Sequence, residues 1–154
     1  MKIHKIDCTR VLQTDINRCW SFFSNPLNLK LLTPEKVFDK INLENFSEMY
    51  PGMIITYVIK PVLNFRFTWV TEITQMKKEK YFIDEQRFGP YKFWHHQHLF
   101  NETENGVEVR DIVHYVMPMG FIGNLIHKFF VKRELERIFE YRNKKMKLLL
   151  ENNS

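Results

Sequence analysis

The feature of the sequence that most constrains its fold is a change of hydrophobic period after Pro34. From there to residue 117, apolar and polar residues alternate over short segments, which is typical of β-strands with one buried face. We expect strands in this region at residues 37–43, 53–62, 65–76, 80–88, 92–101 and 107–117. The separators are short and contain turn-forming or charged residues, so consecutive strands should pair as an antiparallel meander.

The chain on either side of this meander adds one strand and the helices. Residues 2–13 predict a first strand, and Asp15 is expected to cap a short helix. The apolar side of that helix should consist of Ile16, Cys19, Trp20 and Phe23. A second short helix is expected at 27–32, and a long amphipathic helix from near Gly120 to near Leu150. The fold class is therefore α+β: a curled antiparallel sheet of about seven strands on a long C-terminal helix, with two short helices after the first strand.

The expected C-terminal helix has two apolar faces that are out of phase. The first is wide and consists of Phe121, Ile122, Leu125, Ile126, Phe129 and Phe130. The second is narrower and consists of Leu135, Ile138, Phe139, Met146 and Leu149. Residues 131–134 shift the phase between them, and Glu140 with Lys144 forms a helix-favouring pair. We expect the apolar residues to close the sheet and the charged residues to form a solvated outer face.

Composition indicates a single globular domain over residues 1–154. Hydrophobic residues make up 44% and charged residues 27% of the chain, which suits one folded core. The N-terminal residues lack the apolar region of a secretory signal, and no apolar run reaches the roughly 18 residues of a spanning helix. Cys8 and Cys19 match no metal motif and are too few for a disulfide framework. We therefore expect a reduced, cytoplasmic protein.

The net charge of +5 is concentrated at the C-terminus. Residues 120–150 carry eight Lys or Arg and three Glu, which accounts for the whole excess. Such a helix can attract an anionic lipid surface or nucleic acid. Since no stacking platform or basic-aromatic motif accompanies it, we expect no nucleic-acid partner. A transient membrane-surface contact, or a regulatory protein partner on this helix, stays open as an alternative.

The stretch GPYKFWHHQHLF, residues 89–100, places three histidines on one expected strand. Asn105-Gly106 is a strong signal for a two-residue turn, which would set Asp111 diagonal to His98. One face of this hairpin, which we expect to be buried, collects Trp94, His96, His98, Phe100, Val109, Asp111, Val113, Tyr115 and Met117. The opposite, outer face collects Phe93, His95, Gln97, Leu99, Arg110, Ile112, His114 and Val116.

The preceding hairpin decides whether a second carboxylate joins the buried face. If residues 89–91 form a three-residue loop, Asp84 lies opposite His96, and Phe82 lies opposite His98. A two-residue loop would turn Asp84 to the other face. With the longer loop, the wall carries more polarity than a solid core tolerates, and a cavity that holds water or a ligand is expected. The polar residues of that wall are Asp84, Gln86, His96, His98, Asp111 and Tyr115.

Residues 82–100, FIDEQRFGPYKFWHHQHLF, resemble the signature F-x-D-x-Q-x-x-G-P-[FY]-x-x-W-x-H-x-H-x-F of bacterial START-like proteins. These belong to the SRPBCC superfamily, which includes birch-pollen allergens and polyketide cyclases. Further matching positions are Asn28, Leu29, Leu32, Thr33, Pro34, Trp69, Ile73, Asp111, Val113, Tyr115, Pro118 and Gly120. The resemblance implies a helix-grip fold with an elongated apolar cavity and implies no metal. Members carry lipids, bind hormones, cyclise polyketides or recruit partners, so the fold does not fix the function.

We therefore expect the protein to bind or carry a small hydrophobic or amphipathic molecule, lipid-like or polyketide-like, whose polar end meets the His/Asp/Gln cluster. The residues expected to contact it are Trp69, Phe82, Asp84, Gln86, Trp94, His96, His98, Phe100, Asp111 and Tyr115. Loops at residues 25–35, 89–90 and 118–120 are expected to form a mobile lid over the cavity.

The alternative is a cyclase-, dehydratase- or hydrolase-like enzyme on the same wall. In that case His96 or His98 would act as an acid or base oriented by Asp84 or Asp111. No nucleophile is evident, because no serine lies in a recognisable elbow and both cysteines are distant in sequence. The His-x-His pair with an aspartate is a weak metal pattern without cysteine or HExxH context. We assign no metal and no cofactor.

Overall fold

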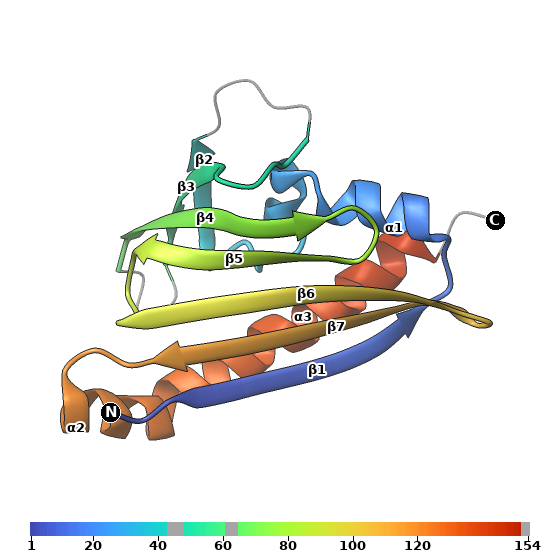
Figure 1. Ribbon diagram of the computed structural model, residues 1–154. Helices are drawn as coiled ribbons and strands as arrows, with labels where there is room; N and C mark the ends of the chain where they lie inside the picture. The colour runs from blue at the N-terminus through green and yellow to red at the C-terminus, as the bar shows by residue number, and fades with distance from the viewer. Residues whose placement is uncertain (43–47, 61–64, 152–154) are drawn as a thin grey trace.

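The computed structural model describes residues 1–42, 48–60 and 65–151. Within these ranges the chain forms a sheet of seven antiparallel strands in the order β1-β7-β6-β5-β4-β3-β2. Their bounds are β1 (His4–Leu12), β2 (Phe38–Asn42), β3 (Ile54–Ile59), β4 (Phe67–Lys77), β5 (Tyr81–Phe88), β6 (Phe93–Thr103) and β7 (Gly106–Val116). The sheet curls, and helix α3 (Lys132–Leu150) lies across one of its faces (Figure 1). The predicted α+β class and helix-grip architecture are confirmed, and the predicted strand positions 43, 61 and 62 lie outside the described residues.

Two short helical segments follow β1, as expected. Helix α1 (Ile16–Phe23) begins where the carboxylate of Asp15 accepts a 2.9 Å hydrogen bond from the backbone N–H of Arg18. Its buried side chains are Ile16, Cys19, Trp20 and Phe23. The second segment is a 3₁₀ helix, η1 (Pro26–Lys30), and therefore begins and ends earlier than the predicted 27–32. Pro26 suits its first position because a missing N–H costs nothing there.

The β6–β7 hairpin has the predicted faces but a different register. Thr103 pairs with Gly106, so the turn lies one residue before the expected Asn105-Gly106, and every pairing shifts by two positions. Gly106 has φ +119°, and a Cβ there would clash with the carbonyl oxygen of Leu12, which explains why glycine opens β7. A shift of two residues preserves the faces of a strand. All nine residues expected inside are buried, and His98 pairs directly with Asp111. Val116, expected on the outer face, is buried as well.

The β5–β6 hairpin has the register of the three-residue loop. Asp84 pairs with His96, and Phe82 pairs with His98. The side chain of Gln86 braces the loop, since its Nε2 donates to the carbonyl of Tyr91 at 2.6 Å and its Oε1 accepts from the Tyr91 N–H at 3.2 Å. Asp84 is thereby turned toward the inner face of the sheet.

Buried apolar side chains form two clusters on the inner face of the sheet. The first contains Trp20, whose ring centroid lies 5.5 Å from that of Phe100. In the second, the ring centroids of Trp69 and Trp94 lie 5.2 Å apart. Helix α3 contributes Met146 to the first cluster and Phe139 to the second. Helix α3 therefore packs against both clusters.

The C-terminal helix is continuous but changes its winding. Helix α2 (Gly120–Ile126) leads into the π-helical turn η2 (His127–Val131) and then into α3. The π turn explains the predicted phase shift, because it displaces the following residues around the helix axis. No helix among the described residues is long and apolar enough to cross a bilayer.

The expectation that the first apolar face closes the sheet is wrong. Most side chains of that face are exposed, Phe121 by 81% and Phe130 by 63%, and only Ile126 among its residues packs against the second core cluster. Residues of the second stripe do pack inward, with Leu135, Phe139 and Met146 buried. Amphipathic periodicity predicts a face but not what covers it, and here α2 extends beyond β1 at one end of the sheet (Figure 1).

Candidate functional site

A cavity of about 160 Å³ lies between the inner face of the sheet and α3. Six of the residues predicted to contact a ligand line it: Trp69, Phe82, Asp84, Trp94, His96 and His98. The region of η1 adds Asn28, Leu29 and Leu32, and α3 adds Leu135, Phe139 and Arg142. Aromatic and aliphatic walls around a few polar groups are typical of a small-molecule site.

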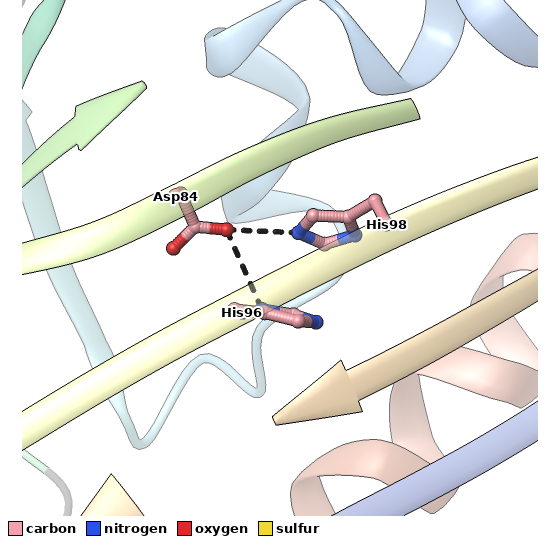
Figure 2. A group of neighbouring side chains, drawn as sticks. All are labelled: Asp84, His96 and His98. Carbon is pink, nitrogen blue, oxygen red and sulfur yellow. Dashed lines mark hydrogen bonds and ion pairs between the residues drawn. The ribbon is translucent and has the colours of Figure 1, made fainter. Parts of the chain in front are cut away.

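The polar end of the cavity is built by two neighbouring strands. Asp84 on β5 faces His96 and His98 on β6, and the three side chains point toward one another (Figure 2). The Nε2 atom of His98 lies 2.9 Å from Oδ2 of Asp84, and Nδ1 of His96 lies 3.5 Å from the same oxygen. Both imidazoles are buried, with 3% of each residue exposed.

Asp111 on β7 lies behind this group. Its Oδ1 atom is 2.8 Å from Nδ1 of His98 and 3.2 Å from Nε2 of His96, and its side chain is fully buried. Arg10 on β1 forms an ion pair with Asp111, and its side chain is 6% exposed. The guanidinium therefore supplies the counter-charge that a buried carboxylate requires.

These contacts determine where the protons lie. His98 has a carboxylate oxygen within 3 Å of each ring nitrogen. The contact of Nε2 with Asp84 is a hydrogen bond, whereas Nδ1 makes no hydrogen bond with Asp111. Burial lowers the pKa of His96 and His98 well below the usual value, so both rings are neutral at neutral pH. Burial also raises the pKa of Asp84. Burial thus acts against a charge on Asp84 and on both histidines, whereas Asp111 has the guanidinium of Arg10 as its counter-charge.

Asp84, His96 and His98 also have the spacing of metal ligands, with one donor atom from each lying within 4.8 Å of the others. Two guanidinium groups oppose this use. The charges of Arg142 and Arg10 both lower the pKa of His98, and the same field would repel a divalent cation. We assign no metal to these residues.

Four of the predicted contact residues lie elsewhere. Gln86 braces the loop after β5, and Phe100 packs in the core against Trp20. Asp111 lies behind the histidines, outside the cavity lining. The hydroxyl of Tyr115 is hydrogen-bonded to Nε2 of His127 at 2.7 Å, in a hollow on the other side of α3. Of the expected lid loops, the segment 25–33 contributes to the cavity lining, whereas residues 89–90 and 118–120 do not line it.

The sequence interpretation missed Arg10 and Arg142. Arg142 was expected on the solvated face of the C-terminal helix, and no position was predicted for the side chain of Arg10. Arg10 shares the buried face of β1 with Leu12, at i,i+2. Arg142 lies three residues after Phe139 and four before Met146, which is the spacing of the buried stripe of α3. In both elements a cationic residue occupies a position where the periodicity predicts a buried apolar side chain, and this signal could have identified Arg10 and Arg142.

The fold is shared with solved structures of distant sequence. A protein from Thermus thermophilus has a TM-score of 0.74 at 14% identity, over 94% of each chain. A protein from Chromobacterium violaceum has a TM-score of 0.73 at 14% identity, over 97% of this chain and 98% of that one. For ginseng major latex-like protein 151 from Panax ginseng the TM-score is 0.71 at 10% identity, over 96% of this chain and 97% of that one.

No protein-family model and no curated protein matches the sequence. The structural matches share the architecture of this chain, which is the helix-grip fold that the signature at residues 82–100 implied. At these identities the likeness establishes the fold alone, and the chemistry has to be argued from the cavity.

Proposed function

We propose that this protein binds or carries a small hydrophobic or amphipathic molecule in the cavity between the sheet and α3. The observation that carries the proposal is the grouping of Asp84, His96 and His98 on the wall of a cavity that is lined largely by aromatic and aliphatic side chains. Buried polar groups cost stability unless they are satisfied. A ligand with a polar end and an apolar body would use both parts of this surface.

The cavity volume limits the part of the ligand that is enclosed. A cavity of about 150 Å³ accommodates benzene, and the volume here is about 160 Å³. A ring or a short aliphatic chain fits, whereas a full lipid or polyketide would require the cavity to widen. Burying a ring with about 150 Å² of apolar surface would contribute about 4 kcal/mol to binding.

Membership of the START-like superfamily and a cytoplasmic location are part of this proposal. The motif at residues 82–100 and the helix-grip architecture support the first. The free thiols of Cys8 and Cys19 support the second, because a reducing compartment maintains them.

Native mass spectrometry of the purified protein, followed by extraction of any bound molecule, tests the proposal. Trp69 and Trp94 line the cavity, so their fluorescence should also report titration with small aromatic and aliphatic compounds. A bound or titratable compound that protects these tryptophans is the expected result. A protein that stays empty across a broad metabolite panel would contradict a binding function.

Acid–base catalysis is the second candidate, and one contact favours it. Asp84 borders the cavity 2.9 Å from His98, and such an aspartate–histidine pair could exchange a proton with a bound molecule. The double substitution H96Q/H98Q separates the two functions. An enzyme would lose turnover while retaining ligand affinity, whereas a carrier would change only in affinity or ligand preference.

A further inference from the structure

Arg142 is a cation on the cavity wall without an ion-pair partner in the described part of the chain. It lines the cavity from α3, and its Nε atom is buried without a hydrogen-bond partner. Its guanidinium carbon lies 5.6 Å from the ring centroid of Phe139, a contact with an aromatic face. No ion pair joins Arg142 to any carboxylate among the described residues. Withdrawing this charge from bulk water is costly unless an anion is supplied.

The other charged groups of the site contact partners other than Arg142. Asp111 is compensated by Arg10, and the two histidines are neutral. Among the described residues that line the cavity, Asp84 is the sole carboxyl group, and its contacts are with His96 and His98. The charge of Arg142 lowers the pKa of Asp84, but no ion pair joins the two side chains. One guanidinium is therefore left at the cavity without an ion-pair partner. Burial lowers the pKa of Arg142, but a guanidinium stays charged at neutral pH.

We propose that Arg142 binds the anionic end of the ligand, and that the ligand is a small monocarboxylic acid with an aliphatic or aromatic body. This rests on the proposed binding function. A carboxylate matches the planar fork of a guanidinium and brings one negative charge, which equals the single charge left over. A phosphate monoester would bring close to two charges and more volume into a cavity of about 160 Å³.

Matched acid and alcohol pairs test the assignment. The probes are hexanoate with 1-hexanol and phenylacetate with 2-phenylethanol, titrated at neutral pH by calorimetry and tryptophan fluorescence. The wild type should bind each acid at least about tenfold more tightly than its alcohol, the effect expected of a hydrogen bond to a charged group. R142Q should lose this preference and retain its affinity for the alcohols. R137Q, on the same helix but 69% exposed and paired with Glu134, is the matched control and should behave as wild type.

The outcomes separate this inference from the proposed function. Binding of acids and alcohols with equal affinity to the wild type, or an acid preference that survives in R142Q, overturns the role of Arg142 and leaves the cavity function standing. Absence of binding for all four probes contradicts both. Circular dichroism checks that R142Q is folded, and R142M provides a second neutral side chain of similar length for the same titrations.

A second observation, independent of the cavity, concerns the start of the C-terminal helix. Six large apolar side chains there are each between 49% and 81% exposed. They form what we call the apolar patch: Met119, Phe121, Ile122, Leu125, Phe129 and Phe130. Exposed apolar surface of this kind on a helix marks an interaction site.

The charges around the apolar patch identify its partner. Residues 112–133 contain no Asp or Glu, whereas Lys128, Lys132 and Arg133 are cationic. The ammonium of Lys128 lies 5.8 Å from the ring centroid of Phe129, so charge and apolar surface are adjacent. Two copies facing each other through this patch would bring like charges together, whereas an anionic bilayer offers the opposite charge.

We infer that the apolar patch docks on an anionic lipid bilayer, with Phe and Ile side chains inserted and the lysines at the head groups. This locates the membrane contact on α2, η2 and the first turn of α3, rather than on the basic residues near the C-terminal end of α3. Co-sedimentation with vesicles tests it, using phosphatidylcholine alone and phosphatidylcholine mixed with phosphatidylglycerol. Wild type should sediment with the anionic vesicles, and added salt should weaken the binding.

The double substitution F121S/F130S should reduce vesicle binding at least about tenfold, because two large apolar groups no longer leave water. L148S is the control, since Leu148 is 56% exposed at the other end of the helix and should be dispensable. The inference is overturned if wild type stays in solution with anionic vesicles, or if F121S/F130S binds them unchanged. If light scattering showed that the wild type is a dimer and that F121S/F130S is a monomer, the apolar patch would be the contact with a second copy, and the membrane inference would be overturned as well.

Discussion

The ion pair between Arg10 and Asp111 supports a sharp prediction, because the same two strands carry a second arginine–aspartate pair on the opposite face. Arg10 of β1 pairs with Asp111 of β7 on the buried side, with side chains 6% and 0% exposed. On the outer face, Arg110 of β7 pairs with Asp7 of β1 through two 2.8 Å hydrogen bonds, with Arg110 44% exposed. The two ion pairs join the same strands and the same residue types, and they differ in how deeply their side chains are buried.

The substitution R10M keeps a side chain of similar length and leaves Asp111 buried without its counter-charge. Removing one partner of a buried ion pair costs about 3–5 kcal/mol. For a chain of this size each kcal/mol lowers Tm by about 2–4 °C, so R10M should lower Tm by roughly 6–20 °C. R110M should change Tm little, because water screens and solvates the charge left on Asp7.

Thermal unfolding followed by circular dichroism measures both variants. The double variant R10M/D111L should regain much of the loss, since an apolar pair replaces a desolvated ionic one. Equal and small changes for R10M and R110M would refute the reasoning, because they would mean that Asp111 is solvated or neutral in the folded protein.

Three further outcomes are expected. Burial lowers the folded-state pKa of His96 and His98 below the unfolded value of about 6.5, so the unfolded chain binds protons first as the pH drops. The free energy of unfolding should therefore fall below about pH 6.5, by up to about 1.4 kcal/mol per pH unit for each histidine. Chemical denaturation at several pH values measures this, and H96Q/H98Q should flatten the curve. Burial raises the pKa of Asp84, so its stabilising proton is lost as pH rises through the folded-state value, and D84N should gain stability relative to wild type toward alkaline pH. G106A should lose about 2 kcal/mol or more in the same assay, because its backbone has φ +119° and its Cβ would clash with the carbonyl of Leu12.

The sequence predicted which face of each strand of the two hairpins is buried, but it predicted the wrong register for the β6–β7 hairpin. His96 and His98 share the inner face of β6 because side chains alternate along any strand, and an error of two positions preserves that parity. The turn after Thr103 depends on the approach of Gly106 to Leu12, on a strand far away in the sequence. Local turn preference contains no information on such a contact.

The local sequence pattern could not predict which charged and apolar residues of the C-terminal helix are buried by neighbouring elements. Phe121 was expected inside because it belongs to an apolar face, yet that face extends past the sheet and is exposed. Arg142 was expected outside because it is charged, yet it borders the cavity. Both errors have one cause: periodicity describes one side of an interface, and burial requires both sides.

The two arginines on either side of the histidine pair differ in one respect, and that difference predicts opposite effects on stability. Arg10 forms an ion pair with Asp111, so substitution of Arg10 should destabilise the protein. Arg142 makes no ion pair with a described carboxylate, so R142Q in the ligand-free protein should remove a desolvated charge without an ion-pair partner and raise the free energy of unfolding by about 1–2 kcal/mol. Urea denaturation of wild type, R142Q and the control R137Q measures the difference. If R142Q were destabilised as strongly as R10M, the counter-charge of Arg142 would have to lie within the protein itself, and a cation reserved for a carboxylate ligand would no longer be needed to explain its position.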